Sequence, residues 1–139
     1  VVVFDSMWHS TEKMARAVLE GFAMKGVPVK LYDLKVDHIS DIMTDVLKAE
    51  YVAVGSPTIN NQMLPTVASF LCYMKGLAPK NKKAFAFGSY GWGDGEWMRT
   101  WEADCRADGA QLLAELVICN EIPDADAQEA CIALGRTLA

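Results

Sequence analysis

Short apolar runs alternate with helical patterns along the whole of this chain. Five of the runs have the length and composition of strands, and they cover residues 1–4, 27–34, 51–54, 84–87 and 112–119. Between and after them, apolar residues recur every three or four positions, as on the buried face of a helix. Strands that alternate with helices form a parallel sheet covered on both faces. We therefore predict an α/β three-layer sandwich around a five-stranded parallel sheet, in the strand order 2-1-3-4-5.

Local signals predict where several helices begin and end. Gly26 is expected to end the first helix, and Ser40 to cap the second. Pro65 stands where the third helix takes its first residue. Helical spacing places Trp97 and Trp101 on one face of the fourth helix, which favours the core over a ligand contact.

Composition and charge limit the class of protein. The chain has 139 residues, of which 52% are apolar, enough for one domain, residues 1–139, with its own core. Its formal charge of −5 argues against a nucleic-acid-binding surface. No apolar run approaches the ~20 residues of a membrane helix, and no signal-peptide pattern is present. We expect a cytoplasmic protein without membrane or nucleic-acid partners. Because the sequence starts inside a strand pattern, we expect it to be a piece of a longer chain.

The cysteines and histidines do not form a metal-binding pattern. The cysteines are widely spaced, at Cys72, Cys105, Cys119 and Cys131. Their spacing differs from that of paired zinc ligands, and two histidines are too few for a His-rich centre. We expect the cysteines to be small buried apolar residues, with Cys105 in register with the two tryptophans of its helix.

The most unusual loop follows the first apolar run. Its residues are Ser6, Met7, Trp8, His9, Ser10 and Thr11. Three of the six carry hydroxyl groups, and a helical pattern begins directly after them. Because backbone N–H groups at a helix N-terminus favour anions, such a loop can hold a phosphate. The alternative is an ordinary capped turn, since Ser and Thr are common helix caps.

Two further loops are expected at the same edge of the sheet, where the third and fourth strands end. The second loop, residues 55–63, has no charged residue and contains the amides Asn60 and Asn61, which can both donate and accept. The third loop holds Tyr90 and Trp92 among several glycines. Glycines let the backbone approach a flat ligand, and aromatic side chains can pack against it. Together, the three loops predict a site for a phosphorylated aromatic cofactor.

Motifs of other proteins with this architecture are absent from the sequence. There is no G-x-x-x-x-G-K-[ST] string of a P-loop, and no G-x-G-x-x-G follows the first strand. The third strand does not end in the Asp of a phosphoacceptor domain, and the first loop has no Cys for a phosphatase.

The three loops resemble those of flavodoxins, and more narrowly those of the flavodoxin domain of flavodiiron proteins. The resemblance rests on residues 5–15, 55–65 and 88–93 and extends over essentially the whole chain. It implies FMN as a tightly but non-covalently bound cofactor. The FMN-binding residues that it implies are Ser6, Met7, Trp8, His9, Ser10, Thr11, Pro57, Thr58, Ile59, Asn60, Asn61, Ser89, Tyr90, Gly91, Trp92 and Gly93. The resemblance implies that the phosphate is held by Ser6, Trp8, Ser10 and Thr11. It also implies that residues 57–61 line the isoalloxazine ring and that residues 89–92 close its pyrimidine side.

The chain departs from the flavodoxin pattern in two places. His9 stands where flavodoxins usually have Gly, and the run of residues 93–96 is longer than the family's pattern. The sequence places no Lys or Arg around the ring, and the nearest charges in the third loop are Asp94 and Glu96. We expect these carboxylates to lower the reduction potential of the cofactor.

The resemblance also implies a function and partners. In flavodiiron proteins, a rubredoxin or an NAD(P)H-dependent reductase supplies electrons that pass through FMN to a diiron centre on a metallo-β-lactamase-like domain, which reduces dioxygen or nitric oxide. This chain has no candidate iron ligands, so we assign no metal ligand and no catalytic residue and expect electron transfer without gas reduction. A homodimer is expected in the full-length protein only. The alternatives are a stand-alone flavodoxin and a non-redox FMN-binding or interaction module.

Overall fold

The computed structural model describes residues 1–107, 111–112 and 117–139, and only the backbone of residues 104–105, 107 and 111–112. The helices are α1 (Ser10–Ala23), α2 (Ile39–Lys48), α3 (Pro65–Leu77), α4 (Glu96–Ala107) and α5 (Ala125–Leu138). The strands are β1 (Val2–Phe4), β2 (Leu31–Asp33), β3 (Tyr51–Ile59), β4 (Gln62–Met63), β5 (Lys83–Tyr90), β6 (Gln111–Leu112) and β7 (Val117–Asn120). Among the described residues, no helix is long and apolar enough to cross a membrane.

The sheet has the predicted parallel order. Its strands follow the order β2-β1-β3-β5-β6, and β7 also pairs with β5. β5 is the fourth of the five predicted strands, and β6 and β7 are the two ends of the predicted fifth strand, whose residues 113–116 lie outside the described part. The observed order therefore corresponds to the predicted order 2-1-3-4-5. β4 is an addition that pairs antiparallel with β3. The α/β prediction and the strand order are therefore confirmed.

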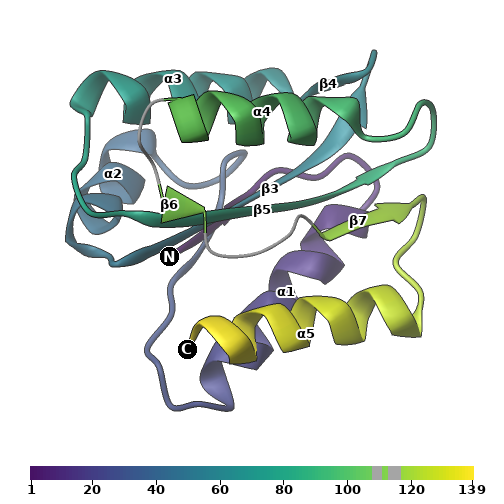
Figure 1. Cartoon of the computed structure of the whole chain (residues 1–139), viewed down its shortest axis with the longest axis horizontal. Coiled ribbons are helices and arrows are strands. Elements are labelled where there is room, and N and C mark those ends of the chain that lie inside the picture. Colours follow the sequence, from purple (N-terminus) through teal and green to yellow (C-terminus); the bar gives the residue numbers. More distant parts are fainter. Residues whose placement is uncertain (108–110, 113–116) are drawn as a thin grey trace.

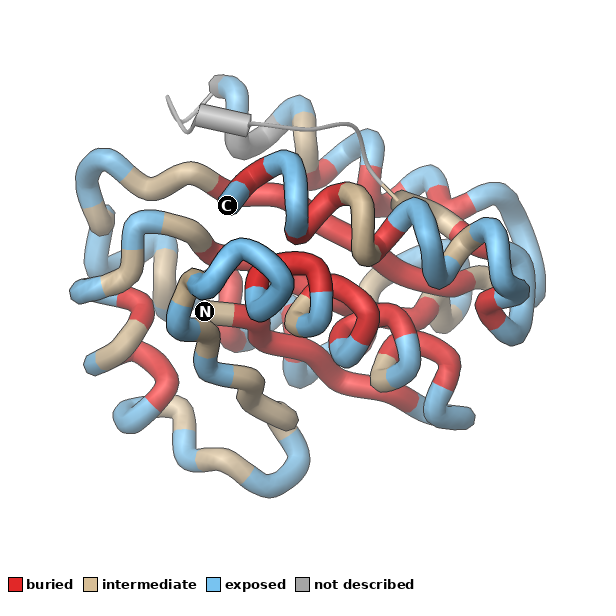
Figure 2. Tube along the Cα trace, turned by 90° about the horizontal axis from the view of Figure 1, so that it is seen from below, coloured by how far each residue is buried: buried red, intermediate tan, exposed pale blue. Residues whose placement is uncertain are grey.

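Two helical layers cover the sheet (Figure 1). Helices α1 and α5 pack on one face, and α2, α3 and α4 on the other. The side chains of β5 show why both faces are buried: Ala84 and Ala86 point to the three-helix side, and Phe85 and Phe87 to the α1–α5 side. Buried residues gather along the strands and on the helix faces that meet them (Figure 2). The continuous apolar runs of the sequence follow from this double burial.

Glycines set the distance between α1 and α5. A β-carbon on Gly21 would lie 2.1 Å from the carbonyl oxygen of Ile132, and one on Gly135 would lie 2.4 Å from that of Val18. Because both neighbours are backbone atoms, the two helices approach each other more closely than any other residue would allow.

Several predictions about the elements are confirmed. Trp97 and Trp101 are buried in the core, and α3 begins at Pro65. The first helix ends close to Gly26, which has a left-handed backbone with φ 71°. The side chain of Cys105 lies outside the described part of the structure.

Three predictions about the elements are wrong. The second strand covers only Leu31–Asp33 instead of residues 27–34, because its neighbour β1 has three residues and Pro28 has no N–H to donate. Ser40 does not cap α2; His38 does, and its Nδ1 accepts a hydrogen bond from the Ser40 N–H at 3.3 Å. Cys72 is exposed, on the outer side of α3, whereas Cys119 and Cys131 are buried as expected.

Candidate functional site

The first loop joins β1 to α1 at the carboxyl edge of the sheet. His9 is the N-cap of α1 and has a left-handed backbone with φ 64°, a conformation that Gly adopts more freely than any other residue. The His9 ring does not cap the helix, and its Nδ1 lies 2.8 Å from Oε2 of Glu12. The hydrogen bonds that Glu12 makes with His9 and with Arg16 lower the pKa of the Glu12 carboxyl group. The first-turn N–H groups of α1 have no intrahelical acceptor, so they remain available to a ligand.

Two serines of this loop face the cavity beside the helix N-terminus. Ser6 and Ser10 are both buried, and both line the cavity. Ser6 is 6% exposed, and its Oγ has no hydrogen-bond partner among the described residues. A buried hydroxyl without a partner is costly, so an acceptor or donor supplied by a ligand would stabilise it.

Thr11 lies deeper than predicted. Its side chain is fully buried, and its Oγ1 lies 3.5 Å from Oγ of Ser89, the residue that β5 contributes to the same edge. Thr11 does not line the cavity. The threonine therefore joins the first loop to the third, and the structure does not turn its hydroxyl toward the ligand space.

The second predicted loop is mostly a strand. Pro57, Thr58 and Ile59 belong to β3, which continues past the expected end of the strand at Val54. Asn60 and Asn61 have φ 49° and 59° and form the two-residue turn of the β3–β4 hairpin. Two successive positive φ angles are typical of a type I′ turn, in which Asn is favoured. The amides therefore have a structural role in the turn, and both also line a cavity.

Hydrogen bonds hold this hairpin at the edge of the sheet. Ser56 Oγ accepts the N–H of Leu64 at 2.9 Å, and Trp97 Nε1 donates to Oγ1 of Thr58 at 2.9 Å. The buried tryptophan thus fixes a threonine that lines the cavity, which gives the core residue Trp97 an indirect place in the site.

The third loop carries the aromatic residues. Ser89 and Tyr90 are the last residues of β5, and Gly91 and Trp92 begin the loop. Gly93 follows with φ 76° and packs against Asn61 of the hairpin. Trp92 is 89% exposed and therefore free to cover a ligand.

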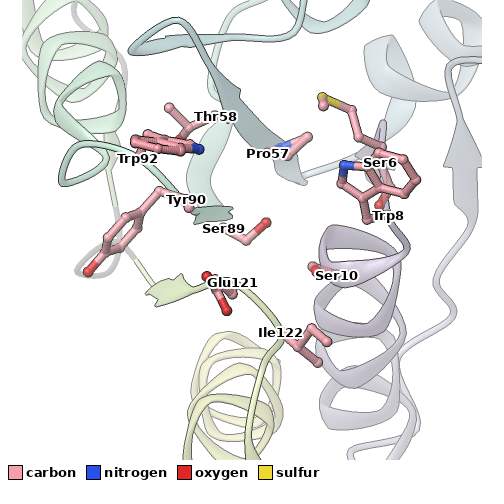
Figure 3. Close-up of a pocket in the computed structure, with 12 residues that line it drawn as sticks. Ser6, Trp8, Ser10, Pro57, Thr58, Ser89, Tyr90, Trp92, Glu121 and Ile122 are labelled. Atoms are coloured by element: carbon pink, nitrogen blue, oxygen red, sulfur yellow. The ribbon is translucent and has the colours of Figure 1, made fainter.

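The loops enclose two adjoining cavities. One has a volume of about 370 Å³ and the other about 420 Å³, and Met7, Thr58 and Trp92 line both. Figure 3 shows Trp8 and Trp92 on opposite sides of the first, with Pro57, Ser89 and Ser10 between them. The predicted residues that line one or both cavities are Ser6, Met7, Trp8, Ser10, Pro57, Thr58, Ile59, Asn60, Asn61, Ser89, Tyr90, Gly91 and Trp92. Three predicted residues do not line the cavities. The ring of His9 contacts Glu12, the side chain of Thr11 is buried against Ser89, and Gly93 packs against Asn61.

Sequence reasoning missed two lining residues, Glu121 and Ile122. They follow β7, whose carboxyl end lies at the same edge as those of β1, β3 and β5. Glu121 has a left-handed backbone, with φ 51°, and its N–H donates to the carbonyl oxygen of Tyr90 at 2.7 Å. The rule that ligands bind over the carboxyl ends of the strands would have found them, had it been applied to the fifth strand.

The charges around the cavities differ from the expectation. Among the described residues that line them, Glu121 alone carries a charged side chain. Asp94 lies outside the lining, and its carboxylate is 2.6 Å from Nη2 of Arg99; Glu96 also lies outside the lining, in the first turn of α4. Glu121, and not Asp94 or Glu96, is therefore the carboxylate that lines the cavities in the described part of the chain. No group of three or more His, Cys, Asp or Glu side chains in the described part could hold a metal ion.

The site fits a phosphorylated aromatic molecule. The buried, unpartnered Ser6 Oγ and the α1 N-terminus offer neutral donors for a phosphate. Trp8, 82% exposed, and Trp92 offer apolar faces for a ring, and cavities of this size are typical of small-molecule sites.

This chain matches known proteins both in sequence and in structure. The model of the flavodoxin family matches residues 2–135. The chain is 42% identical to a nitric oxide reductase of Moorella thermoacetica, covering 100% of this chain and 35% of the relative. The structure of rubredoxin oxygen:oxidoreductase from Desulfovibrio gigas superimposes with a TM-score of 0.91 at 43% identity, covering 98% of this chain and 34% of that one.

A second solved structure matches along nearly its whole length. It is a flavodoxin from the domain Archaea, with a TM-score of 0.86 and 28% identity over 99% of this chain and 94% of that chain. By contrast, the chain spans about a third of the length of its oxidoreductase relatives. The chain therefore belongs to the flavodoxin family, whose members bind FMN, and corresponds to the flavodoxin-like part of flavodiiron proteins.

Proposed function

We propose that residues 1–139 are the FMN-binding, electron-transferring domain of a flavodiiron oxidoreductase. The observation that carries this proposal is the Ser6 hydroxyl, which is buried and has no hydrogen-bond partner among the described residues, in a residue that lines the cavity beside the α1 N-terminus. A phosphate oxygen at this place would satisfy that hydroxyl and the first-turn N–H groups of α1 together.

The phosphate would be held without a cation. Ser6 and Ser10 supply hydroxyl donors, the first turn of α1 supplies N–H donors, and no Lys or Arg is among the described residues that line the cavities. Hydrogen bonds to a charged group are worth roughly 1.5–3 kcal/mol each, so a few neutral donors suffice for tight binding.

The flavin ring would lie between the exposed tryptophans. Trp8 and Trp92 lie on opposite sides of the cavity, and Pro57 and Tyr90 add apolar surface (Figure 3). The hairpin amides Asn60 and Asn61 and the backbone around Gly91 offer polar groups for the edge of the ring. Bound FMN supplies the capacity to accept and release electrons, while these residues orient the ring and keep water from it.

The partners follow from the longer relatives. A rubredoxin or an NAD(P)H-dependent reductase would supply electrons, and a diiron metallo-β-lactamase-like domain would receive them and reduce dioxygen or nitric oxide. The oxidoreductase relatives are about three times as long as this chain, which leaves room for such a domain. In the full-length protein, a homodimer would set the FMN of one protomer against the irons of its partner. The working compartment would be the cytoplasm.

The proposal is tested by titrating the ligand-free protein with FMN and, as a matched control, with riboflavin, which lacks the phosphate. We expect one FMN per chain, and a dissociation constant for riboflavin at least a hundredfold higher, since each 1.4 kcal/mol is tenfold. Anaerobic stepwise reduction should then bleach the absorbance, and an oxidised rubredoxin should restore it. Equal affinity for the two ligands would contradict the phosphate site, and a flavin that cannot exchange electrons would favour the non-redox module.

The stand-alone flavodoxin remains the second candidate, because an archaeal flavodoxin matches along 94% of its own length. The full-length gene product separates the two. A protein with a diiron domain on the same chain supports the first candidate, and a protein that ends with this domain supports the second.

A further inference from the structure

A buried carboxylate lies directly behind the proposed phosphate site. Asp5 directly follows β1, is 2% exposed and precedes the cavity-lining Ser6. Its Oδ1 accepts the backbone N–H of Ser6 at 2.6 Å, and its Oδ2 accepts the hydroxyl of Thr66 in the first turn of α3. Because Asp5 takes the Ser6 N–H, that group is not available to a ligand.

Lys35 binds the carbonyl group of Ser6, whose N–H is bound by Asp5. Its ammonium group donates to the carbonyl oxygen of Ser6 and lies 3.2 Å from Oδ1 of Asp5. Both backbone groups of Ser6 are therefore occupied, one by Asp5 and one by Lys35. The hydroxyl is the one polar group of Ser6 left without a described partner, and Ser6 lines the cavity.

The contacts come from parts of the chain far apart in sequence. Asp5 follows β1, Lys35 lies in the segment between β2 and α2, and Thr66 belongs to α3.

The pairing of Asp5 with Lys35 also balances charge. An unpaired buried carboxylate beside a phosphate site would repel the ligand, and the Lys35 ammonium offsets it.

We propose that Asp5 and Lys35 are positioning residues for phosphate recognition: they clamp the backbone of Ser6 so that its hydroxyl points to the phosphate. This inference rests on the proposed FMN function. It differs from a purely electrostatic role, in which Asp5 would only oppose and Lys35 only attract the phosphate.

The sign of one substitution separates the two roles. Asp5→Asn keeps the shape and removes the charge. If Asp5 acts by position, the weaker acceptor loosens Ser6, and FMN binds less tightly. If Asp5 acts by charge alone, its neutralisation makes FMN bind more tightly.

The experiment compares D5N, K35M, the double variant D5N/K35M and the conservative K35R, with K25M as a control. Lys25 is an exposed lysine just beyond the opposite end of α1, so K25M makes the same charge change away from the loop. For each ligand-free protein, FMN and riboflavin dissociation constants and the thermal midpoint are measured. The ³¹P resonance of bound FMN reports on the phosphate surroundings directly.

We expect D5N and K35M each to weaken FMN about tenfold, as for loss of one hydrogen bond to a charged group, with riboflavin changed less than threefold. The double variant should be no weaker than the worse single variant, because both residues hold the same backbone. K35R and K25M should stay within about threefold of the parent. The ³¹P resonance should shift in D5N, K35M and the double variant but not in K35R or K25M.

Tighter FMN binding by D5N, additive effects in the double variant, or equal losses for FMN and riboflavin would each overturn the inference. If D5N does not fold, K35M is titrated at low and at high salt; its side chain is 50% exposed, so the substitution leaves the core intact. Loss of the clamp weakens FMN equally at both salt concentrations, whereas loss of a purely electrostatic attraction disappears at high salt and would overturn the inference. A parent protein that binds FMN no better than riboflavin would instead refute the proposed function.

Discussion

The side-chain amide of Asn61 occupies the space that a β-carbon on Gly93 would need. Such an atom would lie 2.6 Å from Oδ1 of Asn61. The contact joins the β3–β4 hairpin to the loop after β5, and both residues have left-handed backbones, with φ 59° and 76°. The relative position of the second and third loops thus depends on a glycine that does not line either cavity.

Gly93→Ala should weaken FMN binding without unfolding the protein. A left-handed backbone costs Ala roughly 1–2 kcal/mol, and the new methyl group must displace the Asn61 side chain, so we expect a loss of about five- to thirtyfold in affinity. Gly26→Ala is the matched control, because Gly26 has the same left-handed backbone, with φ 71°, lies outside both cavities and has nothing within 4 Å of a β-carbon. Fluorescence titration with FMN measures both variants, and an effect of equal size in the two would contradict the packing argument.

Ser6→Ala should separate stability from binding. Without ligand, removal of an unpartnered buried hydroxyl should leave the free energy of unfolding unchanged or raise it slightly. With FMN, the same change should raise the dissociation constant about ten- to a hundredfold and leave that of riboflavin nearly constant.

Thr11→Val is the contrasting variant, because its hydroxyl faces Ser89 and not the cavity. We expect a small loss of stability and no change in the ratio of FMN to riboflavin affinity. Chemical denaturation gives the free energy of unfolding of each variant, and titrations with FMN and with riboflavin give the two dissociation constants. A larger FMN-specific loss in Thr11→Val than in Ser6→Ala would contradict the assignment of the phosphate donors.

Glu121→Gln should raise the reduction potential of bound FMN. Reduction adds negative charge to the cofactor, and the carboxylate of Glu121 lines the cavity and opposes it. Because the side chain is exposed, water screens the effect, and we expect about 10–30 mV, smaller at high salt. Asp94→Asn, outside the lining and paired with Arg99, should change the potential less. Spectroelectrochemical titration of both variants tests the difference, and the opposite ranking would contradict it.

Two glycine substitutions should change stability in opposite directions. Gly135→Ala places a methyl group 2.4 Å from the carbonyl oxygen of Val18 and should destabilise the fold by about 1–3 kcal/mol, because α1 and α5 must move apart. Gly76→Ala, in α3, meets nothing within 4 Å and should stabilise the helix by about 0.5–1 kcal/mol. Urea unfolding gives both values, and destabilisation of similar size in both would contradict the close helix contact.

The buried thiols should resist modification and make stability sensitive to alkaline pH. Burial raises the pKa of Cys119 to about 11 and that of Cys131 to about 12. In the native protein, a thiol reagent should therefore modify the exposed Cys72 much faster than either, as peptide mass spectrometry can measure.

The pH effect has a defined sign. Both folded-state pKa values lie above the unfolded value near 9, so the stabilisation is complete below about pH 9 and is lost as pH rises toward 11 and 12. Urea unfolding between pH 8 and 10.5 should show a steeper fall for the parent than for Cys131→Ala. Identical slopes would contradict the linkage.

Much of the fold was predictable from local patterns. Apolar runs and helical periodicity identify the elements, and the rules of parallel connections then give the order of the strands. The same rules bring the first loop, Thr58 and Trp92 to one edge, because parallel strands all end there. For the same reason, Glu121 was within reach of sequence reasoning.

The rest depends on contacts between segments that are distant in sequence. Whether Thr11 points to a ligand or to Ser89, how far β3 continues, and whether Asn61 meets Gly93 are decided by packing across the sheet. The contact of Lys35 with Asp5 spans two strands and has no periodic signature. By itself, the sequence determined the order of the elements and the edge that carries the site, since both follow from local periodicity. Only the tertiary structure decided which hydroxyl and which carboxylate face the cavity, because that choice depends on the side chains that pack behind each loop.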